Sequence, residues 1–360
     1  MKRVFISDCE GPISKNDNAF EITSNFVPNG SKLFTVISRY DDVLAEVLKR
    51  PNYKAGDTLK LVLPFLKAYG ATDDRMRKFS AANLVLISDV KFLLRYITKI
   101  AFAFIVSTSY EHYLHALCEA LEFPFANTCC TKVNIDKYGL TGKEEEKLKQ
   151  ISQEIAEMPI LEISPEAKSL QDFSPEEQRM IKRLDEIFWN EIAKLQIGRI
   201  FSEVNPVGGV EKAEAITDIV RKSAASLANV MYVGDSITDE EAFRLVRENG
   251  GLTVAFNGNR YAVENAEVAV LSETSIVTAI IADIFIRSGK QSVLDLIKNW
   301  NRKTLENSLM NKSLINCFHE RYPRELPKVK IITSENMESL ARESSEFRKR
   351  IRGEAIGRLG

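Results

Sequence analysis

Short, unbroken runs of hydrophobic residues alternate along this chain with longer segments in which apolar residues recur at helical spacing. Runs rich in β-branched and aromatic residues are typical of parallel strands that are buried on both faces. They lie at 2–7, 101–106, 200–204, 230–233, 252–256 and 268–271. Because these runs alternate with helical segments, the pattern predicts an α/β fold built on a doubly wound parallel sheet.

Two long helical segments interrupt this alternation. The first begins near residue 16 and contains turn signals such as Pro28-Asn29-Gly30, while the second is rich in charged residues. Between them, residues 131–142 alternate in polarity and end in turn residues, which predicts a hairpin. We therefore expect a core of 1–15, 101–142 and 198–286, a helical cap at 16–100, a helical insertion at 143–197 and a helical C-terminal tail at 287–360.

Composition and charge narrow the class of protein. The chain has 360 residues, of which 44% are hydrophobic and 28% charged, and its net charge of −1 argues against nucleic-acid binding through a broad basic field. No apolar run approaches the ~20 residues that span a bilayer, and the first residues lack the apolar region of a signal peptide. The five cysteines are scattered, which favours reduced thiols. We expect a cytoplasmic protein without a membrane span.

Acidic residues follow two of the predicted strands directly. Asp8 and Glu10 come after the first strand, and Asp235 and Asp239 come after the strand at 230–233. The carboxyl ends of parallel strands meet at one edge of a sheet, where α/β proteins bind their ligands. Carboxylate oxygens are ligands that Mg²⁺ prefers. The sequence therefore predicts a magnesium site formed by two distant loops.

A hydroxyl and an ammonium group follow in the same pattern. Ser107 comes after the second strand, and Lys212 comes after the loop that contains Gly208 and Gly209. Phosphoryl transfer uses such a set: a carboxylate nucleophile, further carboxylates that hold a metal, and donors that bind the phosphoryl oxygens. The pattern therefore indicates phosphoryl-transfer chemistry.

In this order, the motifs resemble those of the haloacid dehalogenase-like hydrolase superfamily. They read D-C-E-G-P at 8–12, I-V-S at 105–107, G-G-V-E-K at 208–212 and V-G-D-S-I-T-D at 233–239. Residues 124–142 are similar to the phosphoserine-phosphatase-like group. A weaker resemblance is to an archaeal protein described as a subunit of an energy-converting hydrogenase, although no cysteine pattern for Fe–S or nickel occurs. The resemblance covers about half the chain and implies a Rossmann-like core with a cap.

The resemblance also implies roles for individual residues. Asp8 would be the nucleophile that forms an aspartyl phosphate, and Glu10 the general acid and base. The implied metal ligands are Asp8, the backbone carbonyl of Glu10, Asp235 and Asp239, the last either as a ligand or as a residue that orients one. The implied phosphate- and substrate-binding residues are Ser107, Thr108, Ser109 and Lys212.

Glu10 departs from the family pattern, which has Asp at this position. Glutamate has a similar intrinsic pKa but one more methylene group, so its reach changes by about one bond length. Two interpretations follow: a Mg²⁺-dependent phosphatase for a small phosphorylated metabolite, or a weakly active or non-catalytic subunit with a protein partner or a second copy. The basic residues at 348–352 are interpreted as a solvated helix face, with docking of an acidic partner as the alternative.

Overall fold

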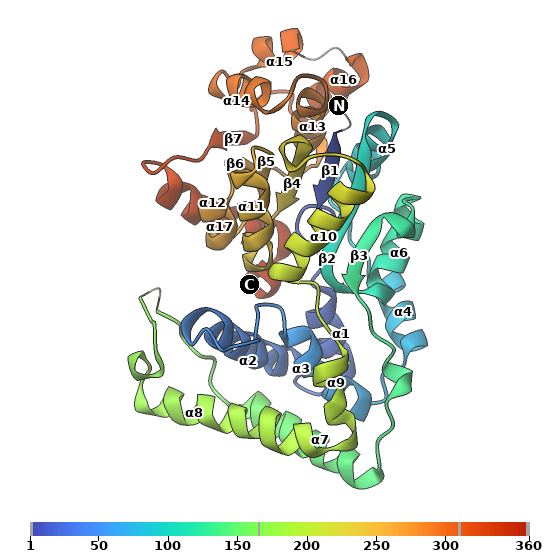
Figure 1. Cartoon of the computed structure of the whole chain (residues 1–360), viewed down its shortest axis with the longest axis vertical. Coiled ribbons are helices and arrows are strands. Elements are labelled where there is room, and N and C mark those ends of the chain that lie inside the picture. Colours follow the sequence, from blue (N-terminus) through green and yellow to red (C-terminus); the bar gives the residue numbers. More distant parts are fainter. Residues whose placement is uncertain (1–2, 165, 309–310, 358–360) are drawn as a thin grey trace.

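A seven-stranded sheet forms the centre of the molecule (Figure 1). The computed structural model describes residues 3–164, 166–308 and 311–357. In spatial order the strands are β3 (Thr128–Thr131), β2 (Phe102–Tyr110), β1 (Val4–Ser7), β4 (Val230–Gly234), β5 (Leu252–Phe256), β6 (Val268–Leu271) and β7 (Lys328–Ile331). All neighbours are parallel except the antiparallel pair β6 and β7.

Helices cover both faces of this sheet. One face carries α5 (Val90–Ile100), α6 (Glu111–Leu121), α13 (Ile276–Ser288), α14 (Lys290–Lys298), α15 (Arg302–Ser308) and α16 (Lys312–Arg321). The other carries α10 (Val210–Lys222), α11 (Glu240–Glu248), α12 (Arg260–Asn265) and α17 (Met337–Arg352). Along β1, Phe5 belongs to the first hydrophobic cluster, whereas Val4 and Ile6 belong to the second. The prediction of a doubly wound α/β sheet is confirmed.

The two helical insertions pack together as one body below the sheet (Figure 1). The first contributes α1 (Asn18–Phe26), α2 (Gly30–Asp42), α3 (Thr58–Ala68) and α4 (Asp73–Ala82), and the second α7 (Gly142–Glu157) and α8 (Pro175–Glu186). They share one hydrophobic cluster, in which Tyr40 stacks on Phe188 with ring centroids 5.7 Å apart. Arg50 and the Tyr40 hydroxyl both donate hydrogen bonds to Asp185. The insertion expected at 143–197 is therefore packed as part of the cap.

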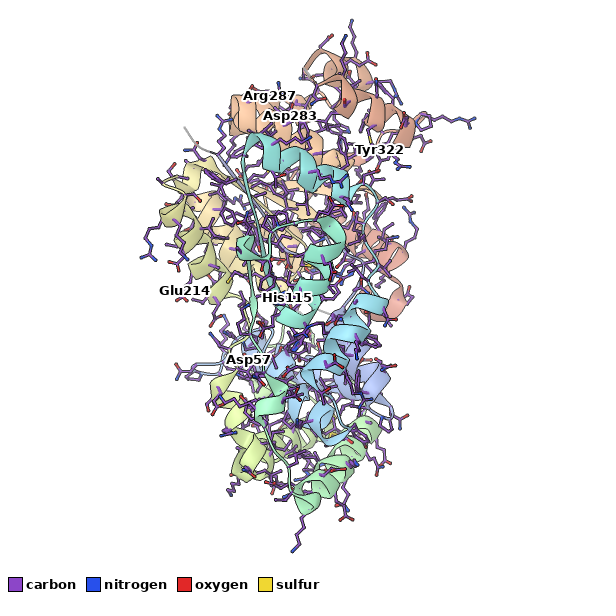
Figure 2. The ribbon with its side chains drawn as sticks, turned by 90° about the vertical axis from the view of Figure 1, so that its right-hand side faces the viewer. Asp57, His115, Glu214, Asp283, Arg287 and Tyr322 are labelled. Atoms are coloured by element: carbon purple, nitrogen blue, oxygen red, sulfur yellow. The ribbon has the colours of Figure 1, made fainter. Side chains whose placement is uncertain are left out.

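Helix α5, expected in the cap, packs on the sheet instead. Its Val90, Leu93 and Ile97 side chains are buried in the cluster that contains α13. The hydroxyl of Tyr96 on α5 lies 2.5 Å from Asp283 Oδ1 on α13. Arg287 Nε lies 2.7 Å from the same oxygen, and both of these α13 residues are labelled in Figure 2. The helical cap therefore ends before residue 90.

Three other local predictions need correction. Residues 200–204 form no strand: α9 (Ile200–Glu203) contacts α3 in the cap and buries Ile200 in the hydrophobic cluster of the insertions. Residues 131–142 form no hairpin, because Asp73 accepts hydrogen bonds from the backbone of Ile135 and Asp136 and holds a 3₁₀ turn. The tail at 287–360 is not wholly helical, because it contributes β7 to the sheet before α17 and the short α18 (Glu354–Gly357).

None of the helices in the described ranges has the length and the hydrophobicity needed to cross a bilayer.

Candidate active site

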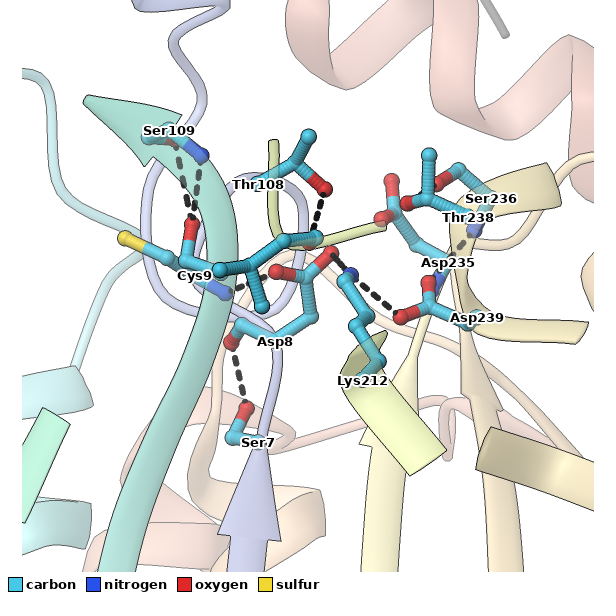
Figure 3. Close-up of polar contacts among 12 residues, drawn as sticks. Ser7, Asp8, Cys9, Thr108, Ser109, Lys212, Asp235, Ser236, Thr238 and Asp239 are labelled. Carbon is cyan, nitrogen blue, oxygen red and sulfur yellow. Dashed lines mark hydrogen bonds and ion pairs between the residues drawn. The ribbon is translucent and has the colours of Figure 1, made fainter. Parts of the chain in front are cut away.

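The loops after β1 and β4 bring together acidic residues that are far apart in the sequence. The strands are parallel neighbours with Ser7 opposite Val233, and the Asp8 amide donates to the Val233 carbonyl at 2.7 Å. As a result, carboxylate oxygens of Asp8, Asp235 and Asp239 lie within 4.8 Å of one another (Figure 3). We call these three residues the carboxylate cluster.

Lys212 places a buried ammonium group inside the carboxylate cluster. Its Nζ lies 2.9 Å from Asp8 Oδ2 and 2.6 Å from Asp239 Oδ1. Burial alone would lower the pKa of Lys212, but the charges of Asp239 and Asp8 raise it. The ammonium group is therefore held as a cation next to Asp8. It reaches this position from the first turn of α10, after a loop in which Gly209 has φ +54°.

Asp239 is saturated with hydrogen bonds. Its Oδ1 accepts from Lys212 Nζ and from the Tyr232 hydroxyl, both at 2.6 Å, and its Oδ2 accepts from the amides of Asp235 at 2.9 Å and Ser236 at 3.0 Å. A Cβ at Gly234 would lie 2.5 Å from the Asp239 carboxyl carbon, so the close approach requires glycine. Of the two roles expected for Asp239, these contacts favour orienting its neighbours over binding a metal directly.

Within the carboxylate cluster, Asp235 has one carboxylate oxygen that accepts no hydrogen bond in the described part of the chain. This oxygen, Oδ1, is buried, whereas Oδ2 contacts the guanidinium groups of Arg348 and Arg352. A Cβ at Gly11, which has φ +106°, would lie 2.1 Å from Asp235 Oδ2. A buried carboxylate oxygen without a donor, close to other carboxylates, fits a divalent cation that takes oxygen ligands.

The three hydroxyl residues at the end of β2 have different surroundings. The Ser107 and Ser109 hydroxyls lie 3.1 Å apart, are buried, and border the same cavity as Asp8. The Thr108 hydroxyl instead donates to the Val207 carbonyl at 3.0 Å (Figure 3). Ser107 and Ser109 are therefore placed to contact a ligand, whereas the Thr108 hydroxyl holds the loop that precedes α10.

Glu10 lies at the start of the cap. Its Oε1 accepts the amide hydrogen of Asn18 at 2.7 Å, at the first residue of α1. Burial, together with the charge of Asp17, raises the pKa of Glu10 well above its ordinary value. A carboxyl group whose pKa is raised holds its proton more strongly, which favours a role as a general acid.

A family comparison covers most of this architecture. A model described as haloacid dehalogenase-like hydrolase matches residues 58–283, more than half of the chain. The chain belongs to this family. The match confirms the predicted superfamily and a hydrolase enzyme; it includes Ser107, Lys212, Asp235 and Asp239 and leaves out Asp8 and the C-terminal helix.

Solved structures give further likenesses. A gene product of Archaeoglobus fulgidus is 25% identical with a TM-score of 0.79, over 100% of this chain and 99% of that chain. Phosphoserine phosphatase in apo form is 12% identical with a TM-score of 0.41, over 77% of this chain and 98% of that one. No curated protein sequence matches. The weaker likeness to a hydrogenase subunit is not shown by these comparisons.

The cavity of this haloacid dehalogenase-like hydrolase lies between the sheet edge and the cap. Its volume is about 110 Å³, below the roughly 300–1,000 Å³ typical of ligand pockets. Phe34, Ser38 and Asp41 of α2 border it from the cap side. Lys54 of the cap contacts Asn205, at 2.6 Å, and Glu211 of the core. These contacts join the cap to the core beside the cavity.

Two arginines of this site were missed at the sequence level. Arg348 and Arg352, interpreted as part of a solvated helix face, have side chains only 3% and 5% exposed. The helix is solvated on its other side, where Arg350 is 64% exposed. The spacing of four between Arg348 and Arg352, in register with Leu340 and an intervening serine, was the available signal.

A pH-dependent stability effect is expected from Asp41 in the cap. Its Oδ2 accepts from the Gly56 amide at 3.0 Å and the Thr58 hydroxyl at 2.8 Å, and burial raises the pKa of the carboxyl from 3.8 to about 7. Because the folded state binds this proton more tightly than the unfolded state, stability is lost as pH rises through this window. Asp41→Asn should therefore raise Tm at pH 8 and change it little at pH 4.

Thermal unfolding at the two pH values measures this effect. Each unit of pKa shift corresponds to about 1.4 kcal/mol, so the gain at pH 8 should be on the order of a few kcal/mol. Asp74→Asn, at an exposed residue on α4, is the matched control and should show no such pH dependence. A lower Tm for Asp41→Asn at pH 8 would mean that the bonds to Gly56 and Thr58 need the ionised carboxylate.

Proposed function

We propose that this protein is a Mg²⁺-dependent phosphatase that hydrolyses a small phosphomonoester through an aspartyl phosphate on Asp8. The observation that carries the proposal is the meeting of Asp8, Lys212 and Asp235. Asp8 lies 2.9 Å from a buried ammonium group, and the nearby Asp235 has a free carboxylate oxygen. Nucleophile, phosphate-binding cation and metal ligand are thus supplied at one point.

Asp8 and Glu10 divide the chemistry between them. A carboxylate oxygen of Asp8 attacks phosphorus, the bond from phosphorus to the ester oxygen breaks, and Glu10 protonates the departing alkoxide. Glu10 then removes a proton from water, whose oxygen attacks the phosphorus of phospho-Asp8. The phosphorus–Asp8 bond breaks, inorganic phosphate leaves, and both carboxyl groups return to their starting states.

The remaining site residues position and stabilise the phosphoryl group. Lys212 and the hydroxyls of Ser107 and Ser109 bind its oxygens, and Thr108 fixes the loop beside them. Asp8, Asp235 and the backbone carbonyl of Glu10 would hold the magnesium ion. When bound, the ion supplies positive charge that offsets the repulsion between a carboxylate and a phosphate dianion.

The substrate is a small phosphorylated metabolite. A cavity of about 110 Å³ beneath the cap has little room beyond the phosphoryl group, so the leaving group must be compact or the cap must open to admit it. Enclosure of this kind excludes bulk water from the reacting groups and does not suit a polymer.

Fluoroberyllate, which imitates a phosphoryl group on a carboxylate, tests the proposal without a known substrate. We expect Mg²⁺ and fluoroberyllate together to raise Tm by several degrees, because a ligand that binds only the folded state stabilises it. Asp8→Asn should abolish this shift. Absence of a shift in the wild-type protein would contradict the proposal and favour the alternative, a weakly active or non-catalytic subunit.

A further inference from the structure

The C-terminal helix α17 delivers two charged side chains to the catalytic edge. Leu340, Ser344, Arg348 and Arg352 recur every four residues and therefore lie on one side of the helix. Leu340 packs in the hydrophobic cluster, and the Ser344 hydroxyl donates to the Gly258 carbonyl at 2.6 Å. The first half of this face anchors the helix, so its second half is held against the active site.

Both guanidinium groups converge on Asp235. Arg348 contacts Asp235 Oδ2 and donates to the Asp235 carbonyl at 3.3 Å. Arg352 lies 3.1 Å from the same Oδ2, and its other nitrogens donate to the backbone carbonyls of Lys15, at 3.0 Å, and Asn16. Because both side chains are buried, solvent and salt screen their charges weakly. The Asp235 charge is thus offset by two fixed cations.

These contacts balance the charge of the site before any ligand binds. The three carboxylates of the carboxylate cluster face three buried cations, Lys212, Arg348 and Arg352. A divalent cation alone adds two positive charges to this arrangement, and a phosphate dianion alone adds two negative charges. When the cation and the dianion bind together, the net charge that they add is zero. Neighbouring acids such as Glu10 and Asp17 change the total charge of the site. They do not change the sign of the effect that each arginine has on the binding of a cation or an anion.

We propose that Arg348 and Arg352 weaken the binding of Mg²⁺ alone and strengthen the binding of the phosphate group, so that the site is filled by both ligands together. The arginines disfavour Mg²⁺ in the free protein, because each places a positive charge beside a ligand of the ion. The same positive charges attract a phosphate dianion, and a bound dianion in turn attracts Mg²⁺ directly. Binding equilibria are reciprocal, so Mg²⁺ strengthens phosphate binding by the same factor. The inference rests on the proposed function, and it assigns the C-terminal helix a part in it.

Calorimetric titrations of Mg²⁺ and orthophosphate, each alone and each in the presence of the other, test this coupling in the full-length protein. In the wild type, orthophosphate should tighten Mg²⁺ binding at least about tenfold, the size expected for one screened charge beside a divalent ion. Arg352→Gln should bind Mg²⁺ alone about tenfold more tightly, and orthophosphate alone about tenfold more weakly, than the wild type, because one fixed charge acts on the two ligands with opposite sign. Arg350→Gln, on the exposed side of the same helix, should match the wild type.

The outcomes distinguish an effect of the arginine charge from an effect of the guanidinium geometry, and both from the absence of a binding site. Arg352→Lys keeps the charge but not the planar fork, and it should keep the wild-type affinity for each ligand. A lysine variant that binds the two ligands as Arg352→Gln does, or unchanged or weaker Mg²⁺ binding in Arg352→Gln, overturns the inference and leaves the phosphatase proposal standing. A wild-type protein that binds both ligands without coupling overturns it with no variant needed. A wild-type protein that binds neither, even together, overturns both proposals.

Discussion

Asp8→Asn is expected to abolish phosphomonoester hydrolysis, lowering kcat by about 10⁴-fold or more, as loss of a covalent nucleophile does in other enzymes. The amide cannot form the phosphorylated intermediate, although it occupies the same space. Release of inorganic phosphate from a generic phosphomonoester in the presence of Mg²⁺ measures the effect. Asp218→Asn, at an exposed residue of α10, is the matched control and should leave the rate unchanged.

The stability of the same variant separates lost chemistry from lost structure. Burial is the main reason that the pKa of Asp8 is raised to about 6, and Lys212 opposes the shift. The folded state thus holds the Asp8 proton more tightly than the unfolded state, and ionised Asp8 lowers stability above this pKa. Asp8→Asn should therefore be at least as stable as the wild type at pH 8. Substantial turnover by this folded variant would show that hydrolysis does not proceed through Asp8.

A smaller loss of activity is expected when Glu10 is replaced by glutamine, because general acid–base assistance contributes about 10²–10⁴-fold. The loss of activity in Glu10→Gln should be smaller than the loss in Asp8→Asn. If Glu10→Gln were silent, the extra methylene would have taken the carboxyl group out of reach of the leaving oxygen.

The central strands could be predicted from sequence because they are buried on both faces. β1, β4, β5 and β6 are therefore continuous apolar runs, which few other elements require. The edge strands β3 and β7 read Thr-Cys-Cys-Thr and Lys-Val-Lys-Ile, and they escaped prediction because an edge strand can expose polar side chains. The apolar run at 200–204 was misleading, because its side chains are buried by the cap and not by a sheet.

Some features of the candidate site could likewise be predicted from the sequence, and others could not. Asp8 and Asp235 could be predicted to meet, since parallel strands end at one edge and local sequence places an acid there. The direction of the Thr108 hydroxyl, the hydrogen bond from Tyr232 to Asp239 and the burial of Arg352 depend on tertiary contacts that no local pattern encodes. Basic residues on a polar helix are predicted to face solvent unless the elements that pack against the helix are known.

Lys212→Met is expected to have the second large effect, acting on stability and activity together. The substitution removes a fully buried cation from between Asp8 and Asp239 and leaves two carboxylates without their shared partner. Breaking a buried ion pair from one side costs about 3–5 kcal/mol. Chemical denaturation should show this loss at pH 8, and phosphate release should fall as well. Lys222→Met, at the exposed end of α10, is the matched control and should change neither.

A double-mutant cycle tells why Lys212 is needed. If its main structural task is to neutralise Asp8, adding Asp8→Asn to Lys212→Met should recover more stability than Asp8→Asn adds to the wild type, because the unpaired buried charge is then removed. Activity should not return, since the nucleophile is gone. If instead the effects of the two substitutions on stability are simply additive, the attraction between the Lys212 ammonium and the Asp8 carboxylate contributes nothing to folding. Lys212 would then be held in place by Asp239 alone, and the 2.9 Å contact with Asp8 would serve catalysis only.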